Sequence, residues 1–311
     1  MIEGLVIKAV GNVYTVRTVD GSLLPCVAKG NLRIQGLKST NPITVGDRVL
    51  YTQLSVDQKG VIHKILERKN YIIRRATNLS KQYHIIAANI DQALLVVTLA
   101  DPPTSTEFID RYLVGCEAYR IPAVLIFNKI DTYNDEQLQQ CRELEEIYSQ
   151  IGYTCLETSV TQNINIDRFK NLVSGKISVL GGHSGVGKSS LVKAVAPDLE
   201  IKIGDISEYH RTGRHITSFS QMYEIFKDAF IIDTPGIKGF GLVDIEKNEL
   251  YHFFPEIFAR SLACKYNNCT HIHEPGCAVV DAVRANLIAY SRYQSYVNIY
   301  FDENEKYRSP F

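Results

Sequence analysis

The stretch Gly182-His183-Ser184-Gly185-Val186-Gly187-Lys188-Ser189 matches the phosphate-binding pattern G-x-x-x-x-G-K-[S/T] at every fixed position. An apolar run at 177–180 precedes it and predicts a buried strand, and residues 190–195 predict the first turns of a helix. In this strand–loop–helix context, the glycines let the backbone curve around a phosphate, with its N–H groups pointing inward at a helix N-terminus. The stretch therefore predicts an α/β domain that binds a nucleotide.

The pattern assigns a role to each part of this loop. Lys188 is expected to reach the β- and γ-phosphates, and the Ser189 hydroxyl is expected to ligate Mg2+. Further contacts to the nucleotide are expected from the rest of the loop and from Ser190, which follows it directly. Because kinases and switch proteins share such a loop, a metabolic phosphotransferase remains an alternative to a GTPase.

A second motif, Asn128-Lys129-Ile130-Asp131, follows an apolar run at 123–127 and fits the N-K-x-D pattern of guanine-binding proteins. A carboxylate at Asp131 can accept hydrogen bonds from guanine N1–H and its 2-amino group, a donor pair that adenine lacks. Asn128 can reach O6 or N7 of the base or brace the phosphate loop, and the Lys129 stem can cover a base face. Four residues alone could form an exposed turn, but together with the phosphate loop they favour a guanine site. A phosphotransferase has no use for this motif.

Two shorter motifs complete the expected nucleotide site. Asp233-Thr234-Pro235-Gly236 follows an apolar run at 230–232 and fits D-x-x-G. Asp233 is placed to hold Mg2+ through water, and the Gly236 N–H is placed to contact the γ-phosphate. A simple Pro-Gly turn is the alternative. Glu157-Thr158-Ser159 resembles the motif whose serine backbone supports the base contact, which assigns that role to Ser159.

The hydrophobic pattern divides the chain into regions. Near-continuous apolar runs at 93–99, 123–127 and 230–232 predict parallel strands buried on both faces, and they alternate with helical patterns at 107–119 and 135–151. This alternation predicts a layered α/β domain. Short strands are expected before it, at 4–10, 12–19, 23–28, 48–54 and 61–66.

The N-terminal strands belong to a basic region. Residues 1–75 hold twelve Lys/Arg against five Asp/Glu, whereas the whole chain has a formal net charge of zero. Five short strands in a basic module predict a small barrel of the oligonucleotide-binding (OB) type that contacts a polyanion. A structural barrel with a solvated basic surface is the alternative.

A cluster of cysteine and histidine lies near the C-terminus. The spacing Cys264-x4-Cys269-x-His271-x5-Cys277 places three thiols and an imidazole within fourteen residues. Three cysteines with one histidine form a closed structural zinc set, so one Zn2+ is expected. His273 is the competing fourth ligand, and a group of buried free cysteines is the alternative to a metal site.

Length and composition limit the remaining possibilities. The 311 residues are enough for two or three domains, and seven scattered or clustered cysteines do not form a disulfide framework. No apolar segment is long enough to span a membrane and no secretory signal is seen, so we expect a cytoplasmic protein without membrane contact. Three parts are predicted: an OB-type barrel at 1–70, a P-loop GTPase domain at 71–241 and a mainly helical zinc-binding domain at 242–311.

The motif order is unusual, because the guanine motif precedes the phosphate loop. With the flanking barrel and Cys/His module, this order resembles the circularly permuted GTPases. In particular, essentially the whole chain resembles the bacterial ribosome small-subunit-dependent GTPase A family, and the segments 65–70 and 213–215 also match. The resemblance implies hydrolysis of GTP to GDP and phosphate with Mg2+, stimulated by the small (30S) ribosomal subunit late in its assembly. It also implies contact with rRNA and a zinc ion in the Cys/His module; a monomer is expected.

Hydrolysis needs a group that orients water. The position after D-x-x-G is Ile237, which cannot hydrogen-bond water, so His215 in the loop 208–218 is the candidate base. A partner contact for His215 is the alternative. The family resemblance implies an Mg2+-binding threonine after this histidine, and we assign it to Thr217. A nucleotide-timed RNA-binding switch with negligible intrinsic turnover is the second reading of the function.

Overall fold

The computed structural model describes residues 1–33, 42–53, 55, 58–75, 83–199, 221–233 and 245–302. These residues form two compact units. The first comprises Met1–Ala93, Asp167–Leu180 and Ser189–Ile237, and the second comprises Leu94–Ile166, Gly181–Lys188 and Lys238–Phe311. Within the described residues, no helix combines the length and apolar character needed to cross a membrane.

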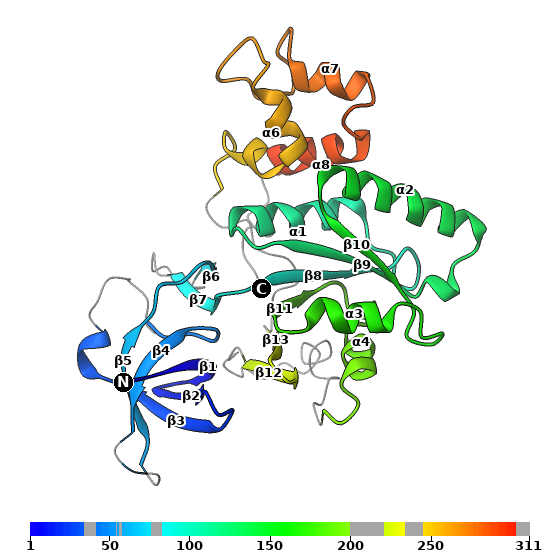
Figure 1. Ribbon diagram of the computed structural model, residues 1–311. Coiled ribbons are helices and arrows are strands. Elements are labelled where there is room, and N and C mark those ends of the chain that lie inside the picture. Colours follow the sequence, from blue (N-terminus) through cyan, green and yellow to red (C-terminus); the bar gives the residue numbers. More distant parts are fainter. Residues whose placement is uncertain are drawn as a thin grey trace, which may run out of the picture. The chain divides into compact units, whose positions relative to one another are not determined.

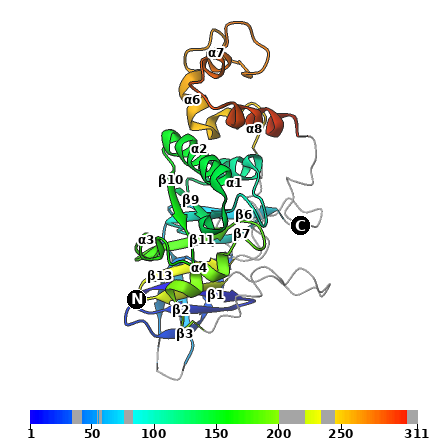
Figure 2. The ribbon, with the colours of Figure 1, turned by 90° about the vertical axis from the view of Figure 1, so that its right-hand side faces the viewer.

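The first unit contains a closed β-barrel, drawn in blue in Figure 2. Its strands are β1 (Ile2–Val10), β2 (Val13–Arg17), β3 (Leu23–Ala28), β4 (Arg48–Thr52) and β5 (Gly60–Ile65). Pairing follows the order β1-β2-β3-β5-β4, and β4 pairs back to β1, which closes the barrel. The interior is apolar, with Val6, Val16, Cys26 and Ile62 fully buried. This five-stranded closure confirms the expected OB-type barrel.

The segment that leaves the barrel is tied back to it. Arg68 donates from Nε to Asp47 Oδ1 at 2.6 Å and from Nη2 to Asp47 Oδ2 at 2.8 Å, and Nη2 also donates to the Pro42 carbonyl. Asp47 is fully buried, so this paired guanidinium keeps a buried carboxylate satisfied. The segment 65–70, which resembles the family, therefore has a structural role: its Arg68 ties the chain to the barrel after the last barrel strand.

The first unit also contains strands that the hydrophobic pattern did not predict. The hairpin β6 (Tyr71–Arg75) and β7 (Tyr83–Ala88) forms a separate two-stranded sheet. β12 (Gln221–Phe226) pairs antiparallel with β13 (Ala229–Asp233), which runs parallel to β11 (Ile177–Gly181). The described helices of this unit are η1 (Gly30–Arg33), α3 (Ile166–Val173) and α4 (Lys188–Val195).

The second unit is built on the neighbouring strands β8 (Gln92–Val97), β9 (Ala123–Asn128) and β10 (Thr154–Thr158). β9 and β10 run parallel, and β8 begins in the first unit. Figure 1 shows α1 (Thr106–Ala118) and α2 (Asp135–Ile151) on one side of these strands. Both helices match the expected ranges and begin with side-chain caps, Ser105 for α1 and a capping box at Asn134 for α2. The layered α/β expectation is confirmed.

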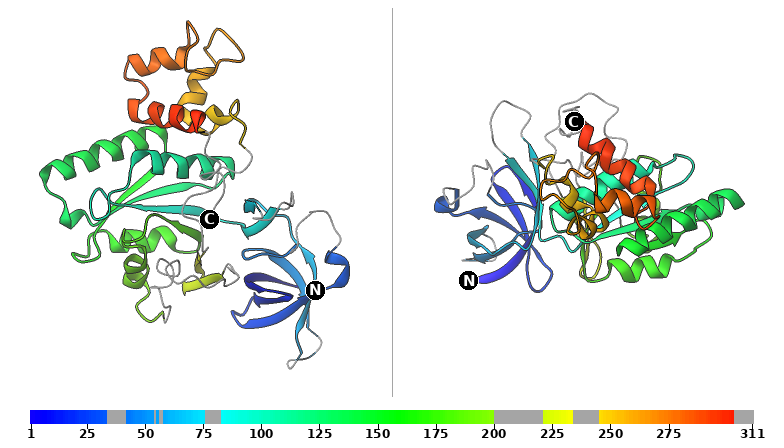
Figure 3. Two further views of the ribbon diagram at one scale, coloured as in Figure 1. Left: turned by 180° about the vertical axis from the view of Figure 1, so that it is seen from behind. Right: turned by 90° about the horizontal axis from the view of Figure 1, so that it is seen from above.

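A helical module completes the second unit. It contains η3 (Leu250–Phe253), α6 (Pro255–Ser261), α7 (Ala278–Arg284) and α8 (Tyr290–Phe301). Its core includes Phe254, Ile257 and Tyr296, and Val114 of α1 belongs to the same cluster. Figure 3 shows the module stacked on α1. A mainly helical C-terminal part is therefore confirmed, whereas the boundaries at 70 and 241 stay predictions.

Candidate nucleotide and metal sites

The phosphate loop connects β11 directly to α4, so the strand–loop–helix context that the motif predicts is present. Gly187 has a φ of +94°, and a Cβ there would lie 2.3 Å from Asn128 Nδ2. Gly182 has a φ of +126°, and a Cβ there would lie 2.3 Å from the Val96 carbonyl oxygen. Both the backbone conformation and the close contacts therefore require glycine at these two positions.

Lys188 lies inside the curve of the loop. Its Nζ donates to the carbonyl oxygens of Gly182 and His183 at 2.7 and 2.6 Å. Burial lowers the pKa of this ammonium to about 8. The loop backbone thus curves around the Lys188 ammonium, which is the group expected to bind phosphate oxygens.

Asn128 joins the guanine motif to the phosphate loop. It ends β9, its Nδ2 donates to the Val186 carbonyl at 2.8 Å, and its Oδ1 accepts from Thr158 Oγ1 at 3.0 Å. Of the two roles expected for this side chain, the structure shows the bracing of the phosphate loop. The two sequence motifs are therefore in direct contact within one unit.

Two residues that the sequence motifs do not include hold the guanine motif. The Tyr133 hydroxyl donates to the Asn128 carbonyl at 2.8 Å and accepts from Leu99 N–H at 2.9 Å. Lys129 has a φ of +64°, and its Nζ donates to the Asp101 carbonyl at 2.6 Å. No spacing rule in the sequence points to Tyr133 or Asp101, because their contacts depend on how the chain folds around β8 and β9.

Asp131 lies in the short helical turn η2 (Ile130–Thr132) and is partly exposed. The Thr161 hydroxyl donates to its Oδ2 at 2.6 Å. The hydroxyls of Ser159 and Thr161 lower the pKa of Asp131, which keeps it ionised and able to accept hydrogen bonds. The motif around Ser159 thus meets the guanine motif in space.

The remaining predicted nucleotide residues are described only in part. Ser189 and Ser190 lie in the first turn of α4, and Asp233 ends β13. The side chain of Asp233 and all of His215, Thr217 and Gly236 lie outside the described residues.

The expected metal ligands come together in the helical module. The ligand atoms of Cys264, Cys269, His271 and Cys277 all lie within 4.8 Å of one another. His271 Nδ1 lies 3.5 Å from Cys264 Sγ and 3.6 Å from Cys277 Sγ, and the last two sulfurs are 3.9 Å apart. Two thiolates bound tetrahedrally to Zn2+ at about 2.3 Å lie about 3.8 Å apart, so these separations fit zinc.

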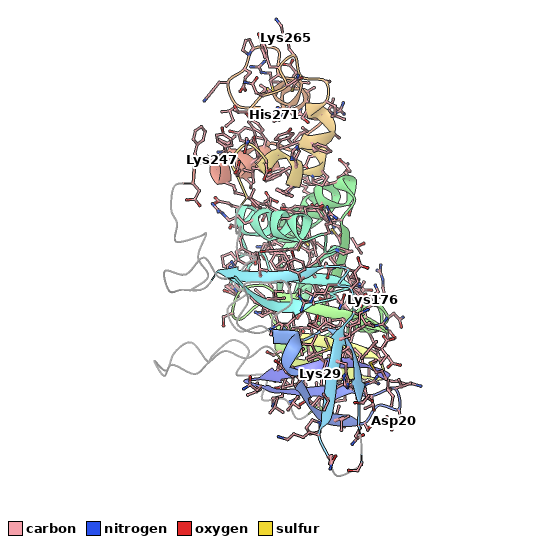
Figure 4. All side chains as sticks on the ribbon, turned by 90° about the vertical axis from the view of Figure 1, so that its left-hand side faces the viewer. Asp20, Lys29, Lys176, Lys247, Lys265 and His271 are labelled. Carbon is pink, nitrogen blue, oxygen red and sulfur yellow. The ribbon has the colours of Figure 1, made fainter. Side chains whose placement is uncertain are left out.

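The histidine in this cluster is His271, which is buried. Figure 4 labels it within the helical module. His273 is exposed and its ring faces Phe301. Burial raises the pKa of Cys269 to about 12 and also raises the pKa of Cys277, while it lowers the pKa of His271. Burial thus favours the protonated form of Cys269 and Cys277, and a metal would have to displace those protons.

Hydrogen bonds hold the backbone of residues 264–277, which carry the four expected metal ligands and are called the metal loop below. Glu274 accepts from Thr270 N–H at 2.7 Å, from Thr270 Oγ1 at 2.6 Å and from the N–H groups of Ile272 and His273 at 3.2 Å. From α8, the Tyr293 and Tyr296 hydroxyls donate to the carbonyls of His271 and Thr270 at 2.9 and 2.7 Å. His271 itself has a φ of +61°, a conformation that these contacts stabilise.

A buried ionic cluster joins this module to the nucleotide-binding part of the same unit. Arg292 of α8 is 1% exposed and donates to Asp110 Oδ1 of α1 at 2.7 Å. It also contacts both carboxylate oxygens of Glu256 in α6, at 2.7 and 3.2 Å, and Tyr148 of α2 donates to the same Asp110 oxygen. The Arg292 guanidinium lies 4.7 Å from the ring centre of Phe254. Charged side chains from α1, α6 and α8, together with the Tyr148 hydroxyl of α2, thus form one cluster.

Comparison with known proteins gives consistent results. A family model described as RsgA GTPase matches residues 65–243, and one described as RsgA N-terminal domain matches residues 3–62. The chain is 52% identical over 313 residues to the small ribosomal subunit biogenesis GTPase RsgA 2 of Bacteroides thetaiotaomicron, with full coverage of both chains. It is likewise 52% identical to the small ribosomal subunit biogenesis GTPase RsgA of Phocaeicola vulgatus, again over both full lengths.

Solved structures agree with these relatives. The crystal structure of YjeQ from Thermotoga maritima superposes with a TM-score of 0.80 at 37% identity, covering 97% of this chain and 98% of that one. YloQ, described as a circularly permuted GTPase, gives a TM-score of 0.77 at 28% identity, covering 98% and 96%. The expected permuted P-loop fold between a barrel and a helical module is confirmed.

Proposed function

The chain belongs to the RsgA GTPase family, and on this premise we propose that it hydrolyses GTP on the small ribosomal subunit while that subunit is being assembled. GTP hydrolysis follows from the family. The small subunit as the site of action is supported by the names of the full-length relatives. The single structural observation that carries the proposal is the hydrogen bond from Asn128 to the Val186 carbonyl, because it assembles guanine and phosphate recognition into one site.

In the proposed reaction, water attacks the γ-phosphorus and GDP leaves with inorganic phosphate as the other product. Lys188 exchanges the Gly182 and His183 carbonyls for phosphate oxygens, and Asp131 accepts the guanine N1–H and 2-amino protons. Mg2+, when bound, neutralises charge on the β- and γ-phosphates, and we assign its binding to Ser189 and Thr217, with Asp233 acting through water. The Gly236 N–H senses the γ-phosphate in this scheme.

We assign the orientation of the attacking water to His215, because Ile237 occupies the position where other GTPases carry a polar side chain. Turnover by the isolated chain is then slow, and a partner that contacts the segment carrying His215 accelerates it. Such partner stimulation reaches several orders of magnitude in other GTPases.

The flanking parts are assigned to the ribosomal partner. The basic barrel supports contact with rRNA, since residues 1–75 contain twelve Lys/Arg but only five Asp/Glu. We assign one structural Zn2+ to Cys264, Cys269, His271 and Cys277, with His271 binding through Nδ1. A cytoplasmic monomer is the state in which we expect the chain to act.

The test is GTP turnover by the purified chain, alone and with isolated small ribosomal subunits, with large subunits as the control. We expect stimulation by small subunits only, and loss of most of that stimulation in His215→Ala. Equal turnover in all three mixtures would contradict the proposed partner. Tight, GTP-dependent binding to small subunits without faster turnover would instead favour a nucleotide-timed RNA-binding switch. Stimulation that persists in His215→Ala would remove only the role given to that residue.

A further inference from the structure

The turn that follows β10 lies against the guanine motif. Its Thr161 donates from Oγ1 to Asp131 Oδ2 at 2.6 Å, across thirty positions of sequence. The Ser159 hydroxyl lies 3.1 Å from the Thr161 hydroxyl and accepts from Gln162 N–H at 3.1 Å. The three side chains of Asp131, Thr161 and Ser159 therefore form a connected polar chain.

The backbone of this turn is held at both ends. Ser159 and Ile164 exchange two backbone hydrogen bonds, at 3.1 and 2.8 Å. Just beyond, Asn165 Nδ2 donates to the Glu157 carbonyl at 2.8 Å. Ser159 is fully buried, whereas Thr161 is exposed. The exposed hydroxyl of Thr161 is thus presented to Asp131 from a backbone that other contacts fix.

Carboxylate orientation matters for guanine recognition. The N1–H and 2-amino donors of guanine require two coplanar acceptors, and a carboxylate that rotates freely offers them only part of the time. A carboxylate oxygen has two lone pairs, so an oxygen that accepts from Thr161 can still accept from a base. A hydroxyl bound to one oxygen therefore fixes the carboxylate plane without blocking recognition.

We propose that Thr161 is a positioning residue for guanine selectivity, whose hydroxyl fixes the Asp131 carboxylate in the plane that accepts both guanine donors. This inference rests on the proposed role of Asp131. It assigns to Thr161 a task that the guanine motif itself does not contain. The residue acts through Asp131 and does not itself touch the nucleotide.

The test compares Thr161→Val with Thr161→Ser in the full chain. Valine keeps the shape of threonine and removes the hydroxyl, whereas serine keeps the hydroxyl. Thr154→Val is the matched control, because Thr154 is also exposed and starts β10. Dissociation constants are measured for GDP, for IDP, which lacks the 2-amino group, and for ADP, which lacks the donor pair.

We expect Thr161→Val to weaken GDP binding about tenfold, equivalent to about 1.4 kcal/mol for one charge-assisted hydrogen bond. IDP binding should weaken less, so the preference for GDP over IDP falls, while Thr161→Ser and Thr154→Val keep wild-type values. An unchanged preference overturns the proposal, whether GDP affinity is kept or both nucleotides weaken equally. A wild-type chain that binds ADP as tightly as GDP would instead overturn the guanine role of Asp131 itself.

Discussion

Lys188 has a function in the structure before any nucleotide is considered. Two loop carbonyls accept from its ammonium, so the cation fixes the backbone at the start of the phosphate loop. The sequence pattern identifies this lysine as a phosphate ligand but does not reveal its bonds to its own loop. Because those bonds are made in a buried place, the charge of the lysine becomes sensitive to pH near neutrality.

Nucleotide affinity should therefore fall in mildly alkaline solution. Burial lowers the pKa of Lys188 to about 8, and bound phosphates favour the charged ammonium. Below pH 8 the lysine is already charged and the affinity for GDP is expected to be constant. Above pH 8 the free protein loses this charge, and the dissociation constant should rise by up to about tenfold per pH unit.

The measurement is a GDP titration by calorimetry between pH 7 and pH 9. Lys188→Arg is the informative comparison, because a guanidinium stays charged throughout this range and should remove the rise. A wild-type dissociation constant that is flat from pH 7 to pH 9 would show that Lys188 does not change charge there.

Several site residues could be identified from the sequence and others could not. Asn128, Lys129 and Asp131 form a compact pattern with a chemical reason for each residue. Tyr133 and Thr161 carry no such signal, since a tyrosine five positions after Asn128 and a threonine in a turn are common anywhere. Their roles appear only when the fold brings them to the backbone of Asn128 and to the carboxylate of Asp131.

At the scale of elements, the barrel was predictable because five short strand-like runs follow one another within a basic region. The buried runs of β8, β9 and β13 gave an equally direct signal. β6 ends in two arginines and β12 is interrupted by Glu224, so neither has a long apolar run, whereas β7 contains one at 85–88, which was a missed signal. β12 pairs antiparallel with β13 across the two-residue turn Lys227-Asp228, so the two strands form a local hairpin whose first strand the apolar pattern did not mark.

The metal loop owes its shape to elements outside the ligand set. Glu274 gathers the N–H groups of the loop, and α8 supplies two tyrosine hydroxyls to its carbonyls. Burial opposes ionisation, but the hydrogen bonds from Thr270 and the backbone lower the pKa of Glu274 to about 2. The carboxylate is therefore charged at neutral pH and holds the loop through charge-assisted bonds.

Glu274→Ala should weaken zinc binding about 10- to 100-fold, as is usual when a group that orients metal ligands is lost. The measurement is competition with a zinc chelator, after elemental analysis has established one zinc per wild-type chain. Glu249→Ala is the control, because Glu249 is an exposed glutamate of the same module that makes no side-chain cap bond. Equal zinc affinity in both variants would contradict the role of Glu274.

At the scale of the molecule, the second unit combines nucleotide recognition with the metal module. The two are joined through Arg292, Asp110 and Glu256, which are buried or nearly so. Such a cluster is compatible with folding only when every charge is paired, and its value lies more in fixing an arrangement than in net stability. It makes the helical module part of the same body as α1.

Arg292→Met should destabilise the chain by about 3–5 kcal/mol, because it leaves the Asp110 carboxylate buried without its cation. Arg284→Met is the control. Arg284 and its partner Asp281 are 75% and 62% exposed, so that exposed pair should contribute at most about 1 kcal/mol. Chemical denaturation followed by circular dichroism measures both variants. A loss in Arg292→Met no larger than that in Arg284→Met would show that the buried pair does not hold the module.

The same burial limits how the protein can be dissected. A recombinant fragment that ends at residue 241 keeps Asp110 in α1 but loses Arg292 and Glu256 together. The cut also removes α6 and α8, which pack against α1 around Val114, so Asp110 and apolar surface of α1 would be exposed together. The covalent boundary between the parts is thus not a boundary at which the chain can be cut freely.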